Sequence, residues 1–361
     1  MRQTTLFQTL TVSFFLLILC GGAILVLTAT PPGMIREERR PAATMPDPSP
    51  DLLLSGEYVS KAEAYALDAL PVRRALYTLY SAVMTKILQN PTVNGIRLES
   101  GTLEKTPPAF DSALFCDNLD TVASYLDRFL SGRSAYFALV AHKGHYRARD
   151  TVYRDAWEGL VKDGRFLLVE TVGTLSYTDY FHTDIHVRPE CYGAFAQAIG
   201  DVMGFEPTFP DSVIPQLTAG GTLSEQMPLL ERYGITDTFT RLDDRMGRIA
   251  AARVFRGDAV SGLYWDGALD EPYDLYLGRE SESALAVIRN PRSESEKRLI
   301  LFRESFARAF LPYLVSAYRE IVVVDLRAPY RMLSGESRLF ADDTTDILVM
   351  VSTHTLLSTR F

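Results

Sequence analysis

The residues that could do chemistry lie in two segments that are far apart in the chain. Asp184 and His186 supply a carboxylate and an imidazole two positions apart, and Ser305 lies in a later segment. A serine hydroxyl is a weak nucleophile, and it becomes reactive when an imidazole base, itself oriented by a carboxylate, takes its proton. Because such a triad is defined by geometry, the chain order Asp, His, Ser is compatible with it. The three residues therefore predict acyl-transfer chemistry if the fold brings them together.

The surroundings of Ser305 favour the role of nucleophile. The apolar run 298–302 predicts a strand, and 306–318 predicts a helix that Pro312 should bend or interrupt. The backbone N–H of Phe306 would then lie at the start of a helix, where unpaired N–H groups stabilise an oxyanion. A serine that merely caps the helix would occupy the same position. Both interpretations of Ser305 remain open from local sequence.

The histidine segment allows two further interpretations. His186 could be held by a neighbouring carboxylate without taking part in any reaction. Alternatively, His182, Asp184 and His186 alternate, so in an extended strand they would point the same way, as ligands of a metal ion must. His142 and His145 could then complete the ligand set. We favour the triad and expect neither a metal ion nor a cofactor.

The rest of the chain predicts an α/β fold. We expect helices at 58–70, 73–88, 111–130 and 190–203, and strands at 135–141, 165–170, 298–302, 320–325 and 346–351. This alternation of helices and buried strands is typical of a parallel sheet covered on both faces. Residues 237–290 differ, because short β-prone pieces broken by Gly and Asp indicate a mostly β insertion.

One predicted helix has a marked apolar stripe. In 73–88, five apolar side chains recur at helical spacing, and we expect them to face a core: Leu76, Leu79, Tyr80, Val83 and Ile87.

The N-terminus predicts a membrane anchor. Residues 9–28 contain no charge and are long enough to cross a bilayer. We favour an uncleaved anchor at 1–30 over a cleaved signal, because the apolar run is long and its exit matches a cleavage site weakly. The Pro-rich residues 31–53 would form a linker, and 54–361 the folded domain.

Composition excludes one class of partner. The net charge is −8 and no basic run occurs, whereas nucleic-acid binding requires clustered Lys and Arg. Beyond Cys20 in the apolar run, Cys116 and Cys191 could form one disulfide or remain as two buried free thiols.

Several blocks of the sequence resemble one bacterial family. Thr183-Asp184-Ile185-His186-Val187, followed by Gly193-Ala194-Phe195, is similar to the Thr-Asp-His-His-Trp signature of the DHHW proteins. Further blocks follow in the family's order: Glu38-Arg39-Arg40, 65–73, Asn94-Gly95-Ile96, 273–278, 303–306, 312–314 and 318–327.

This resemblance implies an SGNH-hydrolase-like fold related to the proteins of alginate and other exopolysaccharide O-acetylation. It implies Asp184, His186 and Ser305 as the triad, and an extracytoplasmic domain on a single-pass cell-membrane anchor. It also implies a polysaccharide substrate and a membrane-bound O-acyltransferase as partner. The activity would be that of an O-acetyltransferase or an esterase.

The chain departs from the family pattern around the site. Ile185 and Val187 replace a His and a Trp, and Glu304 stands where the family has Asp. Arg279 and Glu280 stand where the family has Gly-Asn. The loss of that Asn could change the substrate contacts or the oxyanion site. We predict a divergent but active member. The alternatives are a catalytically inactive, glycan-binding scaffold subunit and, third, a metal-dependent hydrolase.

Overall fold

The computed structural model describes residues 2–38, 40–130, 133–147, 151–227, 234–279, 284–328 and 344–361. These residues belong to two compact units. The first comprises residues 1–94 with 224–234, and the second comprises 95–223 with 235–361. All the candidate catalytic residues lie in the second unit.

A mixed sheet forms the centre of the second unit, with eight strands in the described residues. Its order is β11 (Ala259–Ser261), β10 (Arg253–Arg256), β12 (Leu285–Arg289), β14 (Glu320–Asp325), β13 (Arg298–Arg303), β15 (Thr345–Ser352), β6 (Tyr136–Val140) and β7 (Leu167–Val169). The five strands from β14 to β7 are parallel, and β12, β10 and β11 extend them antiparallel. The parallel sheet expected from the sequence is confirmed, and strands from the β-rich stretch 237–290 lengthen it.

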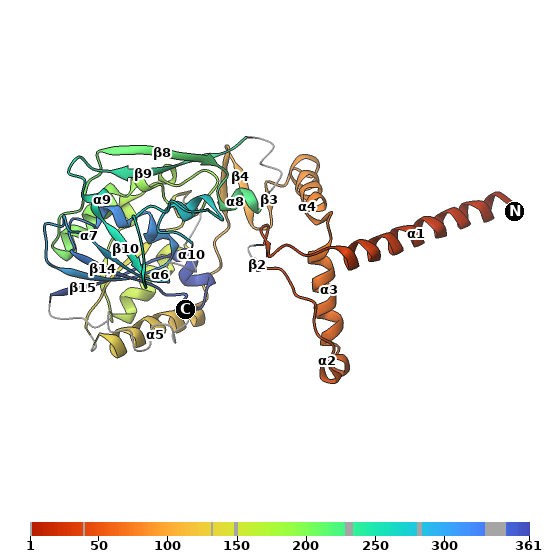
Figure 1. Cartoon of the computed structure of the whole chain (residues 1–361), viewed down its shortest axis with the longest axis horizontal. Helices are drawn as coiled ribbons and strands as arrows, with labels where there is room; N and C mark the ends of the chain where they lie inside the picture. The colour runs from red at the N-terminus through yellow and green to blue at the C-terminus, as the bar shows by residue number, and fades with distance from the viewer. Residues whose placement is uncertain are drawn as a thin grey trace. The chain divides into compact units, whose positions relative to one another are not determined.

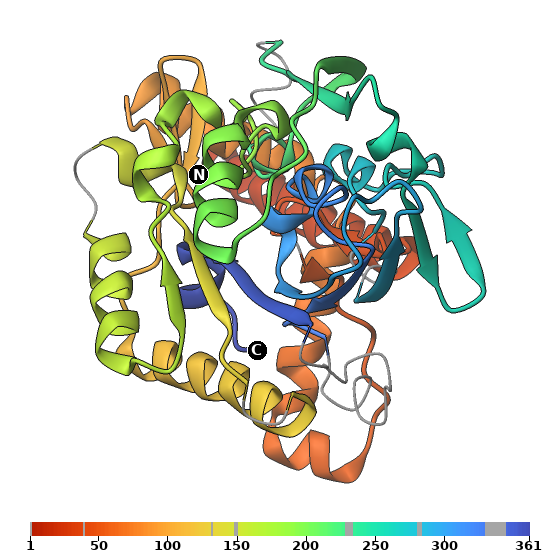
Figure 2. The ribbon, with the colours of Figure 1, turned by 90° about the vertical axis from the view of Figure 1, so that its left-hand side faces the viewer.

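Both faces of this sheet are buried under helices. In β13, Leu299 and Leu301 face one apolar cluster, while Ile300 and Phe302 face the other. The first cluster includes residues of α7 (Gly193–Met203), and the second includes residues of α5 (Ser112–Phe129), α6 (Val152–Asp163) and α10 (Thr353–Ser358). Figure 2 shows the sheet between the green α7 and the yellow α5. Because strand side chains alternate between faces, continuously apolar strands suit a sheet covered on both sides.

Shorter elements surround the sheet. They are β4 (Ile96–Glu99), β5 (Thr102–Lys105), β8 (Ser212–Ala219), α8 (Thr222–Glu225), β9 (Asp237–Asp243) and α9 (Arg248–Ala251). Strands β4 and β5 form a hairpin, and β8 pairs with β9 outside the main sheet. Single 3₁₀ turns lie at Lys143–Arg147, Val172–Thr174, Tyr177–Asp179, Pro189–Cys191, Pro272–Leu275, Ser305–Arg308 and Leu311–Tyr313.

The first unit contains the apolar N-terminal helix. Its elements are α1 (Arg2–Thr28), β1 (Met34–Ile35), β2 (Arg40–Pro41), α2 (Pro50–Ser55), α3 (Glu57–Ala69), α4 (Arg73–Ala82), a π-helical turn (Val83–Ile87) and β3 (Thr92–Val93) (Figure 1). Within α1, residues 7–26 are long and apolar enough to cross a membrane.

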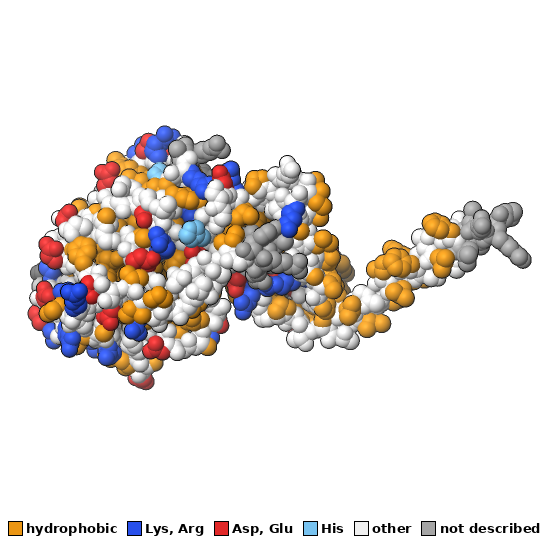
Figure 3. Space-filling view, turned by 90° about the horizontal axis from the view of Figure 1, so that it is seen from above, with side chains coloured by type: hydrophobic (Ala, Val, Ile, Leu, Met, Phe, Trp, Pro, Cys, Tyr) orange, Lys and Arg blue, Asp and Glu red, His pale blue; other side chains and the backbone are white. Residues whose placement is uncertain are grey.

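The expectation that the apolar stripe of residues 73–88 faces a core is wrong. Leu76, Leu79 and Ile87 are 52%, 60% and 71% exposed. The described part of the first unit buries few apolar side chains, namely Ile35, Ala69, Val93 and Met227, so it contains no core large enough to receive the stripe. Figure 3 shows orange apolar side chains on the surface of this unit.

The helix expected at 306–318 is also wrong. The segment forms two short 3₁₀ turns, Ser305–Arg308 and Leu311–Tyr313. Pro312 has no N–H to donate and disfavours helical geometry in the preceding residue, so a continuous α-helix cannot pass through it. Ser305 therefore follows a strand as expected, but it begins a single 3₁₀ turn.

Neither interpretation of the two cysteines matches the structure. Both are free thiols, so they do not form a disulfide. Cys116 is exposed and Cys191 is half-buried, so they are not a pair of buried thiols. Burial raises the pKa of Cys191 to about 12, which keeps this thiol protonated and unreactive at neutral pH.

A buried ion pair joins the two central strands and gives the first prediction. Arg303 of β13 is fully buried and donates to Asp325 of β14 at 2.8 Å. Replacing Asp325 with Asn removes this negative charge from beside the buried guanidinium, so Asp325→Asn should lower the free energy of unfolding by about 3 kcal/mol. Urea unfolding measures this loss.

The matched control is Asp120→Asn, which removes an exposed partner of Arg165. Exposed ion pairs contribute little, so its effect should stay below about 1 kcal/mol. Equal effects of the two substitutions would contradict a structural role for the buried pair.

Candidate active site

Asp184 and His186 lie on a tight loop between two 3₁₀ turns. The loop is closed by Phe181 N–H, which donates to the carbonyl of His186 at 3.1 Å, and by Arg188 N–H, which donates to that of Asp179 at 2.8 Å. The metal interpretation required an extended strand here, but the backbone bends at each residue from 182 to 186. The loop nevertheless brings the carboxylate and the imidazole together.

A second carboxylate, Asp237 of β9, holds this loop in place. It accepts hydrogen bonds from the N–H groups of His182 and Thr183 at 2.8 and 2.6 Å and from the Thr183 hydroxyl at 2.5 Å. The Thr183 hydroxyl oxygen in turn accepts from the N–H of Gly221 at 2.7 Å. Asp237 was not singled out from the sequence, where nothing distinguishes it from other acids.

Asp184 is completely buried and fully engaged. Its Oδ1 accepts from the backbone N–H of His186 at 3.1 Å and lies 2.5 Å from His186 Nδ1, while Oδ2 accepts from Thr222 N–H at 2.8 Å. Burial by itself would raise the pKa of Asp184, but the charge and hydrogen bonds of His186 and the N–H of Thr222 hold that pKa below its usual range. The carboxylate is therefore ionised.

Gly221 makes this burial possible. A Cβ atom at residue 221 would lie 2.6 Å from Asp184 Cβ and 2.8 Å from its Oδ2. Only glycine permits so close an approach of the backbone to the carboxylate.

The other nitrogen of His186 faces the serine. Nε2 lies 2.8 Å from Ser305 Oγ, so one hydrogen-bonded chain joins Asp184, His186 and Ser305. The imidazole is stacked on the ring of Tyr273, with centroids 3.7 Å apart and planes 10° apart, and it also contacts Phe306. These rings fix the plane of the imidazole. Tyr273 was identified from the sequence only as part of a family-like block.

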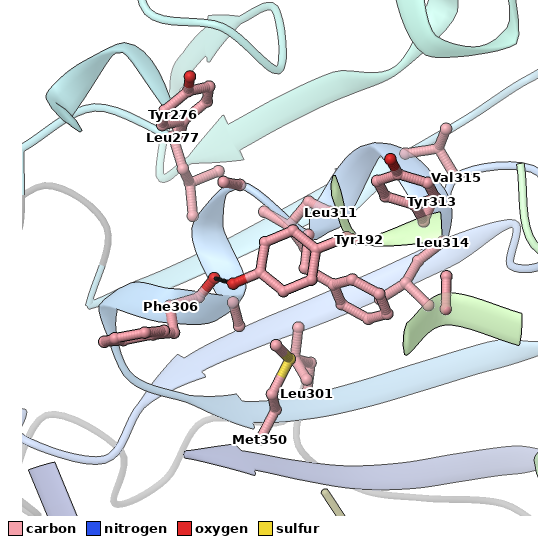
Figure 4. Close-up of a cluster of buried hydrophobic side chains, with 14 of the residues drawn as sticks. Tyr192, Tyr276, Leu277, Leu301, Phe306, Leu311, Tyr313, Leu314, Val315 and Met350 are labelled. Carbon is pink, nitrogen blue, oxygen red and sulfur yellow. Dashed lines mark hydrogen bonds between the residues drawn. The ribbon is translucent and has the colours of Figure 1, made fainter. Parts of the chain in front are cut away.

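Ser305 does not cap the turn that it begins. The N-cap is Glu304, whose side chain accepts from Phe306 N–H at 3.3 Å. The capping interpretation of Ser305 is therefore wrong, and the Phe306 N–H, expected to be unpaired, has an acceptor. The carbonyl of Phe306 accepts from the buried hydroxyl of Tyr192 at 3.0 Å (Figure 4).

Glu304 is a buried carboxylate beside the serine. Its oxygens also accept from Ser352 N–H at 3.2 Å, the Thr355 hydroxyl at 3.1 Å and the Ser305 hydroxyl at 3.0 Å. Ser352 ends β15, the strand next to β13, and Thr355 follows it. The serine hydroxyl thus has one hydrogen and two acceptors within reach, His186 and Glu304.

A buried guanidinium organises the segment that bears Tyr273. Arg308 donates to the carbonyls of Tyr273 and Tyr276 at 3.0 and 2.7 Å, to that of Gly278 at 2.5 Å, and to Asp274 at 3.1 Å. Glu280, one of the departures from the family pattern, lies outside the described residues. Arg308 was missed because its partners are thirty or more positions away in sequence.

The histidines of the metal interpretation do not converge. The His182 side chain is 60% exposed, whereas Asp184 and His186 are buried. The described residues contain no group of three or more His, Cys, Asp or Glu side chains placed to hold a metal ion. Both oxygens of Asp184 are already hydrogen-bonded.

A neighbouring histidine remains neutral. Burial lowers the pKa of His354 to about 3, and repulsion by the charge of Lys105 adds to this shift. His354 follows β15 directly, so it lies at the same edge of the sheet as Ser305.

This shift predicts a pH-dependent stability. The unfolded chain protonates His354 near its ordinary pKa of about 6.5, whereas the folded chain does so only near 3. Between pH 6.5 and 3, proton uptake by His354 therefore favours unfolding. The contribution of neutral His354 to the free energy of unfolding is fully present above pH 6.5 and is lost as the pH falls. Within the window the contribution changes by up to about 1.4 kcal/mol per pH unit.

His354→Gln should remove this slope when urea unfolding is measured from pH 3.5 to 8. Above pH 7 the wild-type and variant curves should run parallel, which serves as the internal control. Parallel curves throughout the acidic window would refute the neutral state of His354.

Comparison with known proteins supports the fold. No family model matches the chain, and no curated protein sequence does. Among solved structures, a DHHW family protein from Eubacterium siraeum has a TM-score of 0.56 at 17% identity, over 74% of this chain and 94% of that chain. Bacillus cereus PatB1, solved with a sulfonyl adduct, has a TM-score of 0.52 at 14% identity, over 73% of this chain and 98% of that chain.

The O-acetyltransferase domain of Pseudomonas putida AlgJ also matches, with a TM-score of 0.45 at 13% identity, over 74% of this chain and 94% of that chain. The first two matches confirm, at the level of the fold, the resemblance to DHHW proteins seen in the sequence: the chain has the α/β fold of the DHHW protein and PatB1.

Proposed function

We propose that this chain is a membrane-anchored Ser-His-Asp acyl-transfer protein, an O-acetyltransferase or esterase that acts on a polysaccharide outside the cytoplasm. The observation that supports this proposal is the unbroken hydrogen-bonded chain from Asp184 through His186 to Ser305. The position of Ser305 after the central parallel strand β13 also supports the proposal, because α/β sheets bind ligands at the carboxyl ends of their strands.

The proposed reaction has two steps. Ser305 Oγ attacks the acyl carbonyl while His186 Nε2 takes the serine proton, and His186 then returns that proton to the leaving oxygen as its bond to the acyl carbon breaks. In the second step a sugar hydroxyl, or water in an esterase, loses its proton to His186 and attacks the acyl-serine. The serine oxygen leaves and recovers the proton. Asp184 orients the imidazole and stabilises its charged form.

The Phe306 N–H remains our proposed oxyanion donor. It would have to exchange its bond to Glu304 for one to the oxyanion. At 3.3 Å that bond is longer than the usual N–H···O distance, so it is weaker than the two hydrogen bonds of the Ser305 hydroxyl.

The membrane and partner assignments follow from the apolar helix and the family resemblance. Helix α1 would anchor the protein, with the second unit on the extracytoplasmic side. A membrane-bound O-acyltransferase would supply the acyl group, which Ser305 would pass to the polysaccharide.

One observation favours the alternative of a catalytically inactive, glycan-binding scaffold. Glu304 accepts both the Ser305 hydroxyl and the Phe306 N–H, the two groups that acyl transfer requires. In the scaffold, this carboxylate would hold them permanently, and the serine would not react.

Replacement of the nucleophile tests the proposal. Ser305→Ala should abolish turnover of a small acetyl ester while the thermal midpoint stays within a few degrees of wild type. The matched control, Ser124→Ala on the exposed face of α5, should retain full turnover. Equal turnover of the Ser305→Ala and wild-type proteins would sink the assignment.

Covalent labelling distinguishes the enzyme from the scaffold. A sulfonyl fluoride or a serine-directed phosphonate should modify Ser305 once, as read by intact mass and peptide mapping. Asp184→Asn should slow this labelling by about 10³-fold, because an amide cannot stabilise the imidazolium that forms. A wild-type protein that remains unlabelled would support the scaffold instead.

A further inference from the structure

A polar cleft lies at the same edge of the sheet as Ser305. The strands lie in the order β13, β15, β6. Ser305 follows β13, Thr353 and His354 follow β15, and His142 follows β6. Neighbouring strands are about 4.8 Å apart, so the end of β6 lies about 10 Å from that of β13. The cleft begins at His142, which follows β6. Its distance from Ser305 is therefore comparable to the length of two sugar units.

The cleft has a volume of about 480 Å³. One wall is the hairpin β4–β5, which contributes Arg97, Glu99 and Glu104. The other is the 3₁₀ turn after β6, which contributes Arg147.

Direct contacts connect the cleft to the serine. His142 N–H donates to the Thr353 hydroxyl at 3.1 Å, and its Nδ1 lies 3.2 Å from the same oxygen. The preceding residue, Ser352, donates its N–H to Glu304, which accepts from the Ser305 hydroxyl. A buried network of polar groups therefore connects the cleft to the nucleophile.

The charges of the cleft cancel. Two guanidinium groups and two carboxylates line it, and they are paired: Arg97 with Glu99 at 3.0 Å, Arg147 with Glu99 at 2.6 Å, and Arg147 with Glu104 at 3.7 Å. A polyanion would be repelled by the carboxylates, and no surplus of cations compensates. Planar carboxylates and guanidinium groups instead offer paired acceptors and donors to adjacent hydroxyl groups.

The floor of the cleft offers an open acceptor. Glu104 Oε2 is buried and accepts no hydrogen bond from the described residues. A Cβ at Gly144 would lie 2.6 Å from Glu104 Oε1 and 3.0 Å from His142 Nε2, so the absence of a side chain at Gly144 leaves room for these two side chains. Arg147 is held over the Tyr177 ring, 4.0 Å from its centroid.

We infer that this cleft binds the sugar units next to the reacting hydroxyl, and that the glycan is neutral and rich in hydroxyl groups, unlike a polyuronate. The inference rests on the proposed function for the role of Ser305, but the binding itself does not require turnover. Glu104 accepts a sugar hydroxyl, and Arg97 and Arg147 donate to its neighbours.

Equilibrium binding to the full chain in detergent micelles tests this inference. We expect cellohexaose or maltohexaose to bind, and hexagalacturonate to bind at least tenfold more weakly. Glu104→Gln should weaken binding of the neutral oligosaccharide about tenfold, because the acceptor loses its charge. The control Glu296→Gln, an exposed partner of Arg319, should leave binding unchanged.

Each outcome bears on one proposal. Failure of both neutral oligosaccharides to bind, equal binding of the uronate, or insensitivity to Glu104→Gln would overturn the inference about the glycan. Binding without ester turnover would overturn the enzyme and leave the glycan site standing. Ester turnover without oligosaccharide binding would overturn the glycan site and leave the enzyme standing.

Discussion

The burial of the Asp184 carboxylate is the constraint on which the rest of the site depends. A charge removed from water must be satisfied by hydrogen bonds, and here both carboxylate oxygens accept from groups of the polypeptide. His186 and Thr222 supply the donors, and Gly221 supplies the space. The loop that contains Asp184 is in turn held by Asp237 from β9. The direction of the imidazole, and thus its approach to the serine, follows from this set of contacts.

Much of this arrangement could be predicted from the sequence, for reasons that are local. The strands β6, β13, β14 and β15 each contain an uninterrupted apolar run, which is what burial on both faces requires. Asp184 and His186 are close in sequence, so their contact needs only one loop. Their meeting with Ser305 was predicted from residue types and the family resemblance, and the structure brings the three side chains together.

The contacts that were missed connect distant parts of the chain. Tyr273 stacks on His186, Arg308 fixes the segment around Tyr273, and Glu304 reaches the end of β15. No spacing in the sequence encodes such pairs. The apolar stripe of residues 73–88 was predicted wrongly for a different reason. Helical periodicity indicates that one face is apolar, but it does not indicate that the first unit has a core to cover that face.

The position of Ser305 between two acceptors has a consequence for the state of the site. A hydroxyl with one hydrogen can serve His186 or Glu304, but not both. When the imidazole bears a proton on Nε2, the serine must receive that hydrogen bond and turn its own hydrogen to Glu304. When Nε2 is bare, the hydrogen is free to turn back. A reactive and an unreactive form thus share one set of heavy-atom positions, and loss of the Nε2 proton with rotation of the serine hydroxyl converts the second into the first without any movement of the backbone.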